Sequence, residues 1–179
     1  GKSTLMKVLF GMEPPSSGEI ILRGENVKFS SSKDAIAHGI GMVHQHFMLV
    51  ESFTAAQNII LGMEPKKGLF VSEEEAVRFT KELSSKYNLE VEAKAVTRTL
   101  PVGVKQKIEI LKALARGAEI LILDEPTAVL APQETDQLFE ELIHLKEQGH
   151  TIVFISHKIP EIKRISDRIT VMRAGCFVG

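Results

Sequence analysis

The sequence has 179 residues, with a single cysteine, no tryptophan and one tyrosine, and its formal net charge is only −1. Because Cys176 has no second cysteine to pair with, an internal disulfide is excluded, and a reducing compartment is the simpler expectation. The near-neutral charge argues against the broad basic surface that nucleic-acid binding requires. We therefore expect no nucleic-acid partner.

Long apolar runs are also missing from the sequence. No stretch approaches the roughly 20 apolar residues that span a bilayer, and the beginning shows no signal-peptide pattern. Any membrane role is therefore expected to come through partner subunits. The first residue is glycine, and the chain opens on half of a phosphate-binding motif. We expect an N-terminally truncated fragment.

The composition that remains is ordinary for a globular domain, with 44% hydrophobic and 25% charged residues. Two unbroken apolar runs, 120–123 and 152–155, predict strands that are buried on both faces of a parallel sheet. The amphipathic segment 133–148 between them predicts a helix. A further apolar run predicts a last strand over 169–172.

The first half of the chain predicts different elements. Short strands at 19–22 and 27–29 predict a hairpin-like pair. From about residue 47 the pattern changes to polar helices, and Ser72 followed by three glutamates predicts a capped helix that reaches about Tyr87. This stretch is interpreted as a helical insertion.

The first residues, Gly1-Lys2-Ser3-Thr4, precede an amphipathic helix and are typical of the second half of a Walker A phosphate loop. Backbone N–H groups at the helix start would face the phosphates, and Lys2 would reach the β- and γ-phosphates. The hydroxyl of Ser3 would hold Mg²⁺. Four residues also occur by chance, so the motif needs further support.

Asp124 and Glu125 follow the apolar run 120–123 directly. An acid at the carboxyl end of a parallel strand is the Walker B arrangement, although solvated acids at a strand end are the alternative. Asp124 would hold Mg²⁺, and Glu125 would act as a general base on water. Together the motifs predict an α/β fold: a P-loop NTPase (RecA-like) core with a parallel sheet, a small antiparallel β part and an α-helical insertion.

Three further segments identify the kind of NTPase. Gln45 follows a strand, 100–106 precedes a helix shortly before the acidic strand, and His157 follows the next strand. This order resembles the ABC transporter ATPases, with their Walker A, Q-loop, signature, Walker B, D-loop and H-loop, over essentially the whole chain. Segments 41–49 and 124–130 resemble the simple-sugar and nucleoside importer branch most closely.

The resemblance implies an ATP-hydrolysing subunit that powers an importer of simple sugars or nucleosides from the cytoplasmic face of the cell membrane. It implies two kinds of partner: a second ABC ATPase domain, arranged head to tail or in tandem, and transmembrane permease subunits. His44 and His46 are interpreted as loop residues. The implied catalytic residues are Glu125, His157 and Gln45; the implied ATP-binding residues are Gly1, Lys2, Ser3, Thr4, Leu100, Pro101, Val102, Gly103 and Gln106; and the implied Mg²⁺ ligands are Ser3, Gln45 and Asp124.

Two positions depart from the family pattern. Pro101 stands where the signature usually has a serine that caps its helix and contacts the ATP of the other domain, and proline offers neither a hydroxyl nor an N–H. Ala131 stands where a threonine or serine would complete a capping box with Glu134. Each lost cap is expected to weaken its helix start by about 1 kcal/mol.

Two other functions are weighed against the leading one. A degenerate half would complete or regulate a partner's ATPase site without efficient hydrolysis; Glu125 and His157 favour catalysis, whereas Pro101 favours degeneracy. A soluble ABC protein of DNA repair or translation would carry long coiled coils or basic extensions, which this sequence does not show. The expected division is 1–46 and 113–179 as the nucleotide-binding core, with 47–112 as the helical subdomain that carries the signature.

Overall fold

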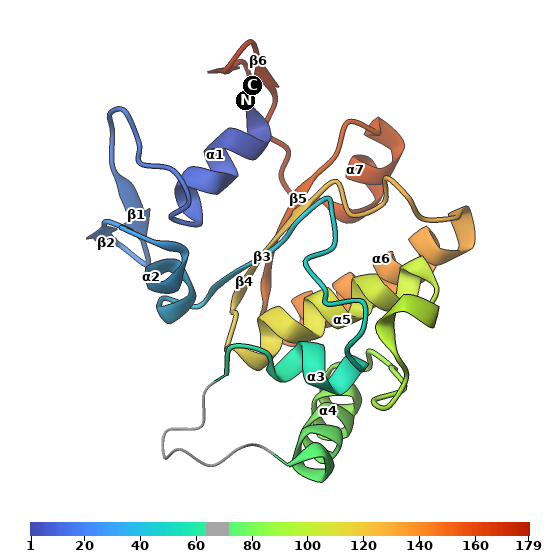
Figure 1. The fold of residues 1–179 in the computed structure, drawn as a ribbon. Helices are drawn as coiled ribbons and strands as arrows, with labels where there is room; N and C mark the ends of the chain where they lie inside the picture. Colours follow the sequence, from blue (N-terminus) through green and yellow to red (C-terminus); the bar gives the residue numbers. More distant parts are fainter. Residues whose placement is uncertain (64–71) are drawn as a thin grey trace.

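The computed structural model describes residues 1–63 and 72–179 (Figure 1). At the centre of this described part is a parallel three-stranded sheet in the order β3–β4–β5, formed by Ile40–Val43, Ile120–Asp124 and Thr151–Ile155. Val43 pairs with Leu123, which in turn pairs with Phe154. Because the strands are parallel and end nearly in step, the residues that follow them meet at one edge of the sheet.

Side chains of β4 alternate between two apolar layers, as the pleat of a strand dictates. Leu121 and Leu123 join one buried cluster, whereas Ile122 joins another on the opposite face. The first face is covered by the helices α3 (Ala55–Ile60), α4 (Glu73–Tyr87), α5 (Val102–Ala115) and α6 (Pro132–Glu147). The second face is covered by α1 (Lys2–Leu9), α2 (Ser32–Ala37) and the β1–β2 hairpin (Figure 1). The two predicted strands are therefore confirmed, but only β4 is buried on both faces, since Ile152, Val153 and Phe154 of β5 are half-buried.

The helical insertion shares its core with the sheet. Ile59 of α3 and Leu83 of α4 belong to the same buried cluster as Leu121 of the sheet. The predicted cap of α4 is present: the Ser72 hydroxyl accepts the Glu75 N–H at 3.2 Å, and the Glu75 carboxylate accepts the Ser72 N–H at 3.1 Å. A short 3₁₀ turn, η1 (Thr97–Thr99), precedes α5. Among the helices of the described residues, none is both long and apolar enough to cross a bilayer.

The N-terminal hairpin is present, but its second strand begins earlier than expected. β1 (Ile20–Leu22) pairs with β2 (Glu25–Val27), so the expectation of a strand at 27–29 is wrong beyond Val27. Arg23 and Gly24 between them have φ of 53° and 83°. Positive φ at both central residues makes a two-residue turn that matches the strand twist, and the chain therefore re-enters the ladder immediately at Glu25.

The last predicted strand is also displaced. After α7 (Ile159–Ile165), the chain forms a separate hairpin of β6 (Met172–Arg173) and β7 (Cys176–Phe177), so residues 169–171 are not a strand. Ala174 and Gly175 turn the chain with φ of 49° and 84°. Because this turn returns the chain at once, the segment pairs with its own continuation rather than with the buried sheet, and Val171 remains 50% exposed.

Candidate functional site

Ser3 and Asp124 meet at the carboxyl edge of the sheet. Asp124 is the last residue of β4 and is 8% exposed. The Ser3 hydroxyl, from the first turn of α1, donates to Asp124 Oδ1 at 3.0 Å, across 121 positions of sequence. A hydroxyl and a carboxylate are oxygen ligands of the kind that Mg²⁺ prefers. The pair therefore fits the magnesium site that the resemblance implies.

The start of α1 offers N–H groups and a cation beside this pair. Gly1 is the N-cap, and its carbonyl accepts the Leu5 N–H at 3.0 Å. Lys2, Ser3 and Thr4 form the first turn, whose N–H groups have no acceptor within the helix. Lys2 lines a cavity of about 730 Å³ together with residues of β5 and α7. A helix start with a lysine favours an anionic ligand.

Glu125 turns the chain sharply just beyond β4. Its φ of 49° lies in the left-handed region, while its N–H still donates to the Ile155 carbonyl of β5 at 3.0 Å. Such a conformation in a residue other than glycine costs about 1–3 kcal/mol and persists only where its surroundings fix it. Glu125 Oε1 lies 3.3 Å from His157 Nδ1, and the His157 side chain is 65% exposed. The pair can therefore orient a water molecule and accept its proton.

Glu161 of α7 joins the two loops that carry Glu125 and His157. Its Oε2 accepts the hydroxyl of Thr127 at 2.7 Å and that of Ser156 at 3.2 Å. Thr127 is 2% exposed, so the contact is shielded from water. Glu161 is not part of any motif of the sequence. Its position four residues after His157, at a helix start, was the available clue, but only the fold shows that it reaches Thr127.

Gln45 lies at the same edge, two residues beyond β3, and its side chain is exposed. Within the described residues, no hydrogen bond or ion pair joins Gln45 to Ser3 or Asp124. Its neighbour His44, interpreted as a plain loop residue, is half-buried with its ring against Phe10. Burial lowers the pKa of His44, and the nearby negative charge of Asp124 opposes that effect.

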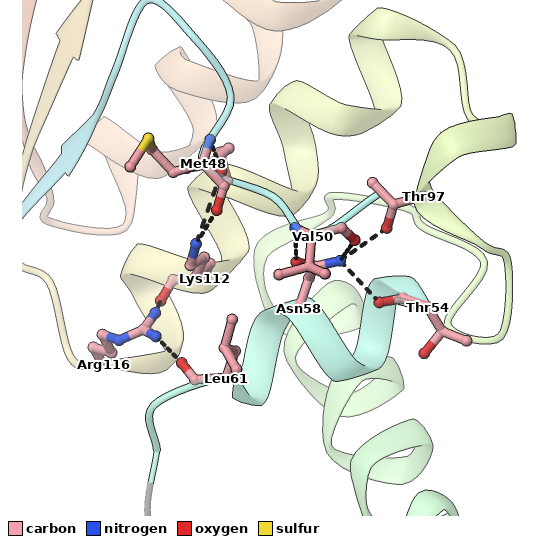
Figure 2. Close-up of polar contacts among 9 residues, drawn as sticks. Met48, Val50, Thr54, Asn58, Leu61, Thr97, Lys112 and Arg116 are labelled. Atoms are coloured by element: carbon pink, nitrogen blue, oxygen red, sulfur yellow. Dashed lines mark hydrogen bonds and ion pairs between the residues drawn. The ribbon is translucent and has the colours of Figure 1, made fainter. Parts of the chain in front are cut away.

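The chain after Gln45 is held by side chains rather than by a strand (Figure 2). The Met48 N–H donates to Glu109 Oε1 at 2.9 Å, and Lys112 Nζ donates to the Met48 carbonyl at 2.7 Å. Glu109 is 5% exposed, and burial raises its pKa against the opposing charge of Lys112. Both backbone groups of Met48 are thus bound to α5.

Asn58 of α3 holds the next part of the same segment (Figure 2). The Val50 N–H donates to Asn58 Oδ1 at 2.8 Å, and Asn58 Nδ2 donates to the Val50 carbonyl at 3.0 Å and to Thr97 Oγ1 at 2.9 Å. Asn58 is completely buried. No sequence pattern indicates the role of Asn58, Glu109 or Lys112, because the contacts that hold this segment are made to backbone groups of Met48 and Val50.

The signature-like residues form the start of α5. Pro101 is the exposed N-cap, and Val102 and Gly103 are the first two residues of the helix. Leu100 packs against the buried cluster that contains Leu121 and Leu123. Gln106 is 3% exposed, and its Nε2 has no hydrogen-bond partner among the described residues. Within these residues, no hydrogen bond or ion pair connects this segment to Ser3, Asp124 or Glu125. Within the described residues, no polar contact thus joins the two groups of predicted residues.

Comparison with known proteins supplies a context for this geometry. The profile of the ABC transporter family matches residues 1–128. The chain is 49% identical over 175 residues to the nucleoside import ATP-binding protein NupA of Lactococcus lactis subsp. cremoris, covering 98% of this chain and 35% of that protein. It is 44% identical over 180 residues to the ribose import ATP-binding protein RbsA of Rhodopirellula baltica, covering 100% of this chain and 35% of that protein. The chain spans about a third of the length of these relatives.

A solved structure extends the likeness to the fold. The ATP-binding cassette MJ0796, described as a dimer in a post-hydrolysis state with bound ADP and Pi, superimposes with a TM-score of 0.78 at 26% identity. The match covers 98% of this chain and 77% of that one. The expected fold class is confirmed: an α/β core with a parallel sheet, small antiparallel parts and a helical insertion.

Proposed function

The chain belongs to the ABC transporter family, and we propose that it is the ATP-binding and ATP-hydrolysing part of an importer of simple sugars or nucleosides. The observation that carries this proposal is the edge of the sheet, where Ser3 touches Asp124 and Glu125 faces His157. The substrate class is supported by the names of the two relatives, a nucleoside import ATP-binding protein and a ribose import ATP-binding protein.

Each residue at the edge has a distinct part in the proposed reaction. The N–H groups of the first turn of α1 and the Lys2 ammonium bind the phosphates of ATP. Ser3, Asp124 and Gln45 would hold Mg²⁺, which when bound would offset the phosphate charge. Glu125 orients a water molecule for attack on the γ-phosphorus and accepts its proton, while the bond from the γ-phosphorus to the bridging oxygen breaks and ADP leaves. His157, held against the Glu125 carboxylate, keeps the carboxylate in place and contacts the γ-phosphate.

The proposed assembly contains a second ATPase domain. In the described residues no polar contact joins the start of α5 to Ser3, Asp124 or Glu125, and MJ0796 is described as a dimer. A head-to-tail pair, of two subunits or of tandem domains, would bring the signature of each domain to the ATP of the other. We further propose that permease subunits carry the solute and that the pair lies against them at the cytoplasmic face of the membrane.

Pro101 supports a second candidate function. As the N-cap of α5 it makes no side-chain hydrogen bond, and it cannot donate one to a phosphate. A chain with a defective signature but intact acids would serve mainly to complete or regulate the partner's site. The two candidates differ in whether Glu125 contributes to hydrolysis.

Single-turnover ATP hydrolysis by the protein at its natural length, assembled with its membrane partners, separates these candidates. Replacing Glu125→Gln removes the proton acceptor and is expected to slow hydrolysis by about 10²- to 10⁴-fold while MgATP still binds. Glu140→Gln, the same change at an exposed position of α6, is the matched control and should leave the rate unchanged. A rate that does not respond to Glu125→Gln would establish the degenerate alternative.

A further inference from the structure

Helix α5 begins without a side-chain cap of its own. Pro101 has no side-chain acceptor, and its carbonyl accepts the N–H groups of Val104 and Lys105, each at 3.1 Å. The N–H groups of the first turn that lie before these need acceptors from elsewhere, because a helix start leaves four of them without intrahelical partners. The Gly103 N–H finds one outside α5: it donates to Glu134 Oε1 at 3.2 Å, across 31 positions of sequence.

Glu134 serves its own helix with its second oxygen. Glu134 Oε2 accepts the Ala131 N–H at 2.9 Å, at the start of α6. One carboxylate therefore spans the starts of two helices, where a negative charge is favoured by both helix dipoles. The starts lie on the same side of the molecule (Figure 1). Farther along the same two helices, Lys107 Nζ and Glu141 Oε1 form an ion pair at 2.7 Å.

Gly103 makes this approach possible. A Cβ atom added at Gly103 would lie 2.9 Å from Glu134 Oε1 and 3.3 Å from its carboxyl carbon. Real Cβ atoms do not come that close, so any larger residue would displace the carboxylate. The absence of a side chain at 103 and the length of the side chain at 134 thus fit each other.

We propose that Glu134 is a positioning residue. It supplies the N-terminal cap of α5 that Pro101 cannot provide, and it fixes the starts of α5 and α6 to each other. The consequence of this contact for activity rests on the proposed function. There, α6 holds in place the signature residues at the start of α5, which would contact the ATP of the partner domain. The loss expected from Pro101 is thereby repaired from within the chain.

Hydrogen exchange tests the contact without reference to activity. In the protein at its natural length, Glu134→Ala should lower the protection of the Gly103 amide by about tenfold, the size of one lost hydrogen bond to a charged group. Glu134→Gln, which keeps one accepting oxygen but loses the charge, should lower it less and remains available if the alanine variant does not fold. Glu140→Ala on the same helix is the control, with unchanged protection. Unchanged protection in Glu134→Ala would overturn the proposal.

Restoring the missing cap distinguishes positioning from general stability. With the partners assembled, Glu134→Ala should lower the turnover number by about tenfold at an unchanged KM for ATP. Adding Pro101→Ser should recover most of that loss, because a serine hydroxyl can cap the first turn itself. A double variant as slow as Glu134→Ala would overturn the repair. If the wild type hydrolyses no ATP, the proposed function fails, and the exchange experiment still decides the role of Glu134.

Gly103→Ala gives a test through the sign of its effect. Alanine normally stabilises a helix relative to glycine. With Glu134 present, the added Cβ displaces the carboxylate, and the melting temperature should fall. In the Glu134→Ala background the same change should raise the melting temperature. Effects of one sign in both backgrounds would contradict the proposed contact.

Discussion

The acidic edge of the sheet and the start of α5 are constructed from different kinds of contact. At the sheet edge, Asp124 and Glu125 are delivered by the strand that immediately precedes them, and the register with β5 sets their place. At the start of α5, the local residue Pro101 contributes no side-chain cap, and Glu134 of another helix contributes the acceptor. The two acids of the sheet edge are thus placed by their own strand, whereas the start of α5 is completed by a residue of another helix.

This difference predicts where each region is vulnerable. The sheet edge should respond to substitutions of its own residues, whereas α5 should respond to substitutions on the elements packed against it. Two of those elements hold α5 through polar contacts: α6 through Glu134 and Glu141, and the segment after β3 through Met48, which contacts Glu109 and Lys112. Changes in these contacts test the comparison.

The largest effect is expected from Glu141→Ala. The Lys107 and Glu141 side chains are only 12% and 7% exposed, so the change leaves the Lys107 ammonium buried without its counter-charge. Removing one partner of a buried pair typically lowers the free energy of unfolding by about 3 kcal/mol. Chemical denaturation measures this loss. Glu140→Ala, the exposed neighbouring acid, is the control and should change stability by less than about 0.5 kcal/mol.

The loss of unfolding free energy in Glu141→Ala should arise from the helices and leave the sheet edge unchanged. The affinity of the folded protein for MgATP, whose proposed site lies on α1 and β4, should be the same in Glu141→Ala as in the wild type. A weaker affinity in the folded protein would show that the sheet edge depends on distant helix contacts as well.

The next largest effect is expected from Asn58→Leu. Asn58 is completely buried and bonds both backbone groups of Val50, so a leucine leaves the Val50 N–H and carbonyl without their partner in part-buried surroundings. Such groups together cost about 2 kcal/mol. Denaturation should show this loss, and hydrogen exchange should show the Val50 amide as the position most affected. A loss below about 0.5 kcal/mol would mean that water replaces Asn58 there.

The same division explains what the sequence could predict. The strands 120–123 and 152–155, the cap at Ser72 and the order of the motifs depend on neighbouring residues, and the structure reproduces them, although the second strand is mostly half-buried. The early start of β2 depends on the positive φ of Arg23, and an arginine in the sequence does not indicate such a conformation. The contacts of Glu161 with Thr127 and of Glu134 with Gly103 could not be predicted, because only the folded chain brings these residues near each other. Acidic residues are common at exposed helix starts, so the residue type alone does not indicate these contacts.

Ala131→Thr tests the start of α6 with a smaller effect. Ala131 has the extended conformation of an N-cap, and Glu134 already accepts its N–H, but alanine has no acceptor to return. A threonine hydroxyl would accept the Glu134 N–H and complete the capping box, which should stabilise the protein by about 1 kcal/mol. Ala131→Val, with the same shape and no hydroxyl, should give no such gain. Equal melting temperatures for the two variants would show that Glu134 already satisfies this helix start.

The smallest effect concerns pH and the end of the sheet opposite the acids. His150 immediately precedes β5, and its ring lies against Tyr87. Burial lowers the pKa of His150 below the usual 6.5. The charge of Lys86 also lowers this pKa, whereas the charge of Glu119 raises it. Because the unfolded chain then binds more protons than the folded one, stability falls as the pH drops below about 6.5. His150→Asn should flatten the dependence of the unfolding free energy on pH between about 7.5 and 5.5, leaving the part due to His44, whose pKa is also lowered by burial. Glu109→Gln should act in the opposite direction, since burial raises the pKa of Glu109 and its protonation in the folded state favours folding as the pH falls. An unchanged slope in His150→Asn would place the acid sensitivity of the sheet at its functional edge instead.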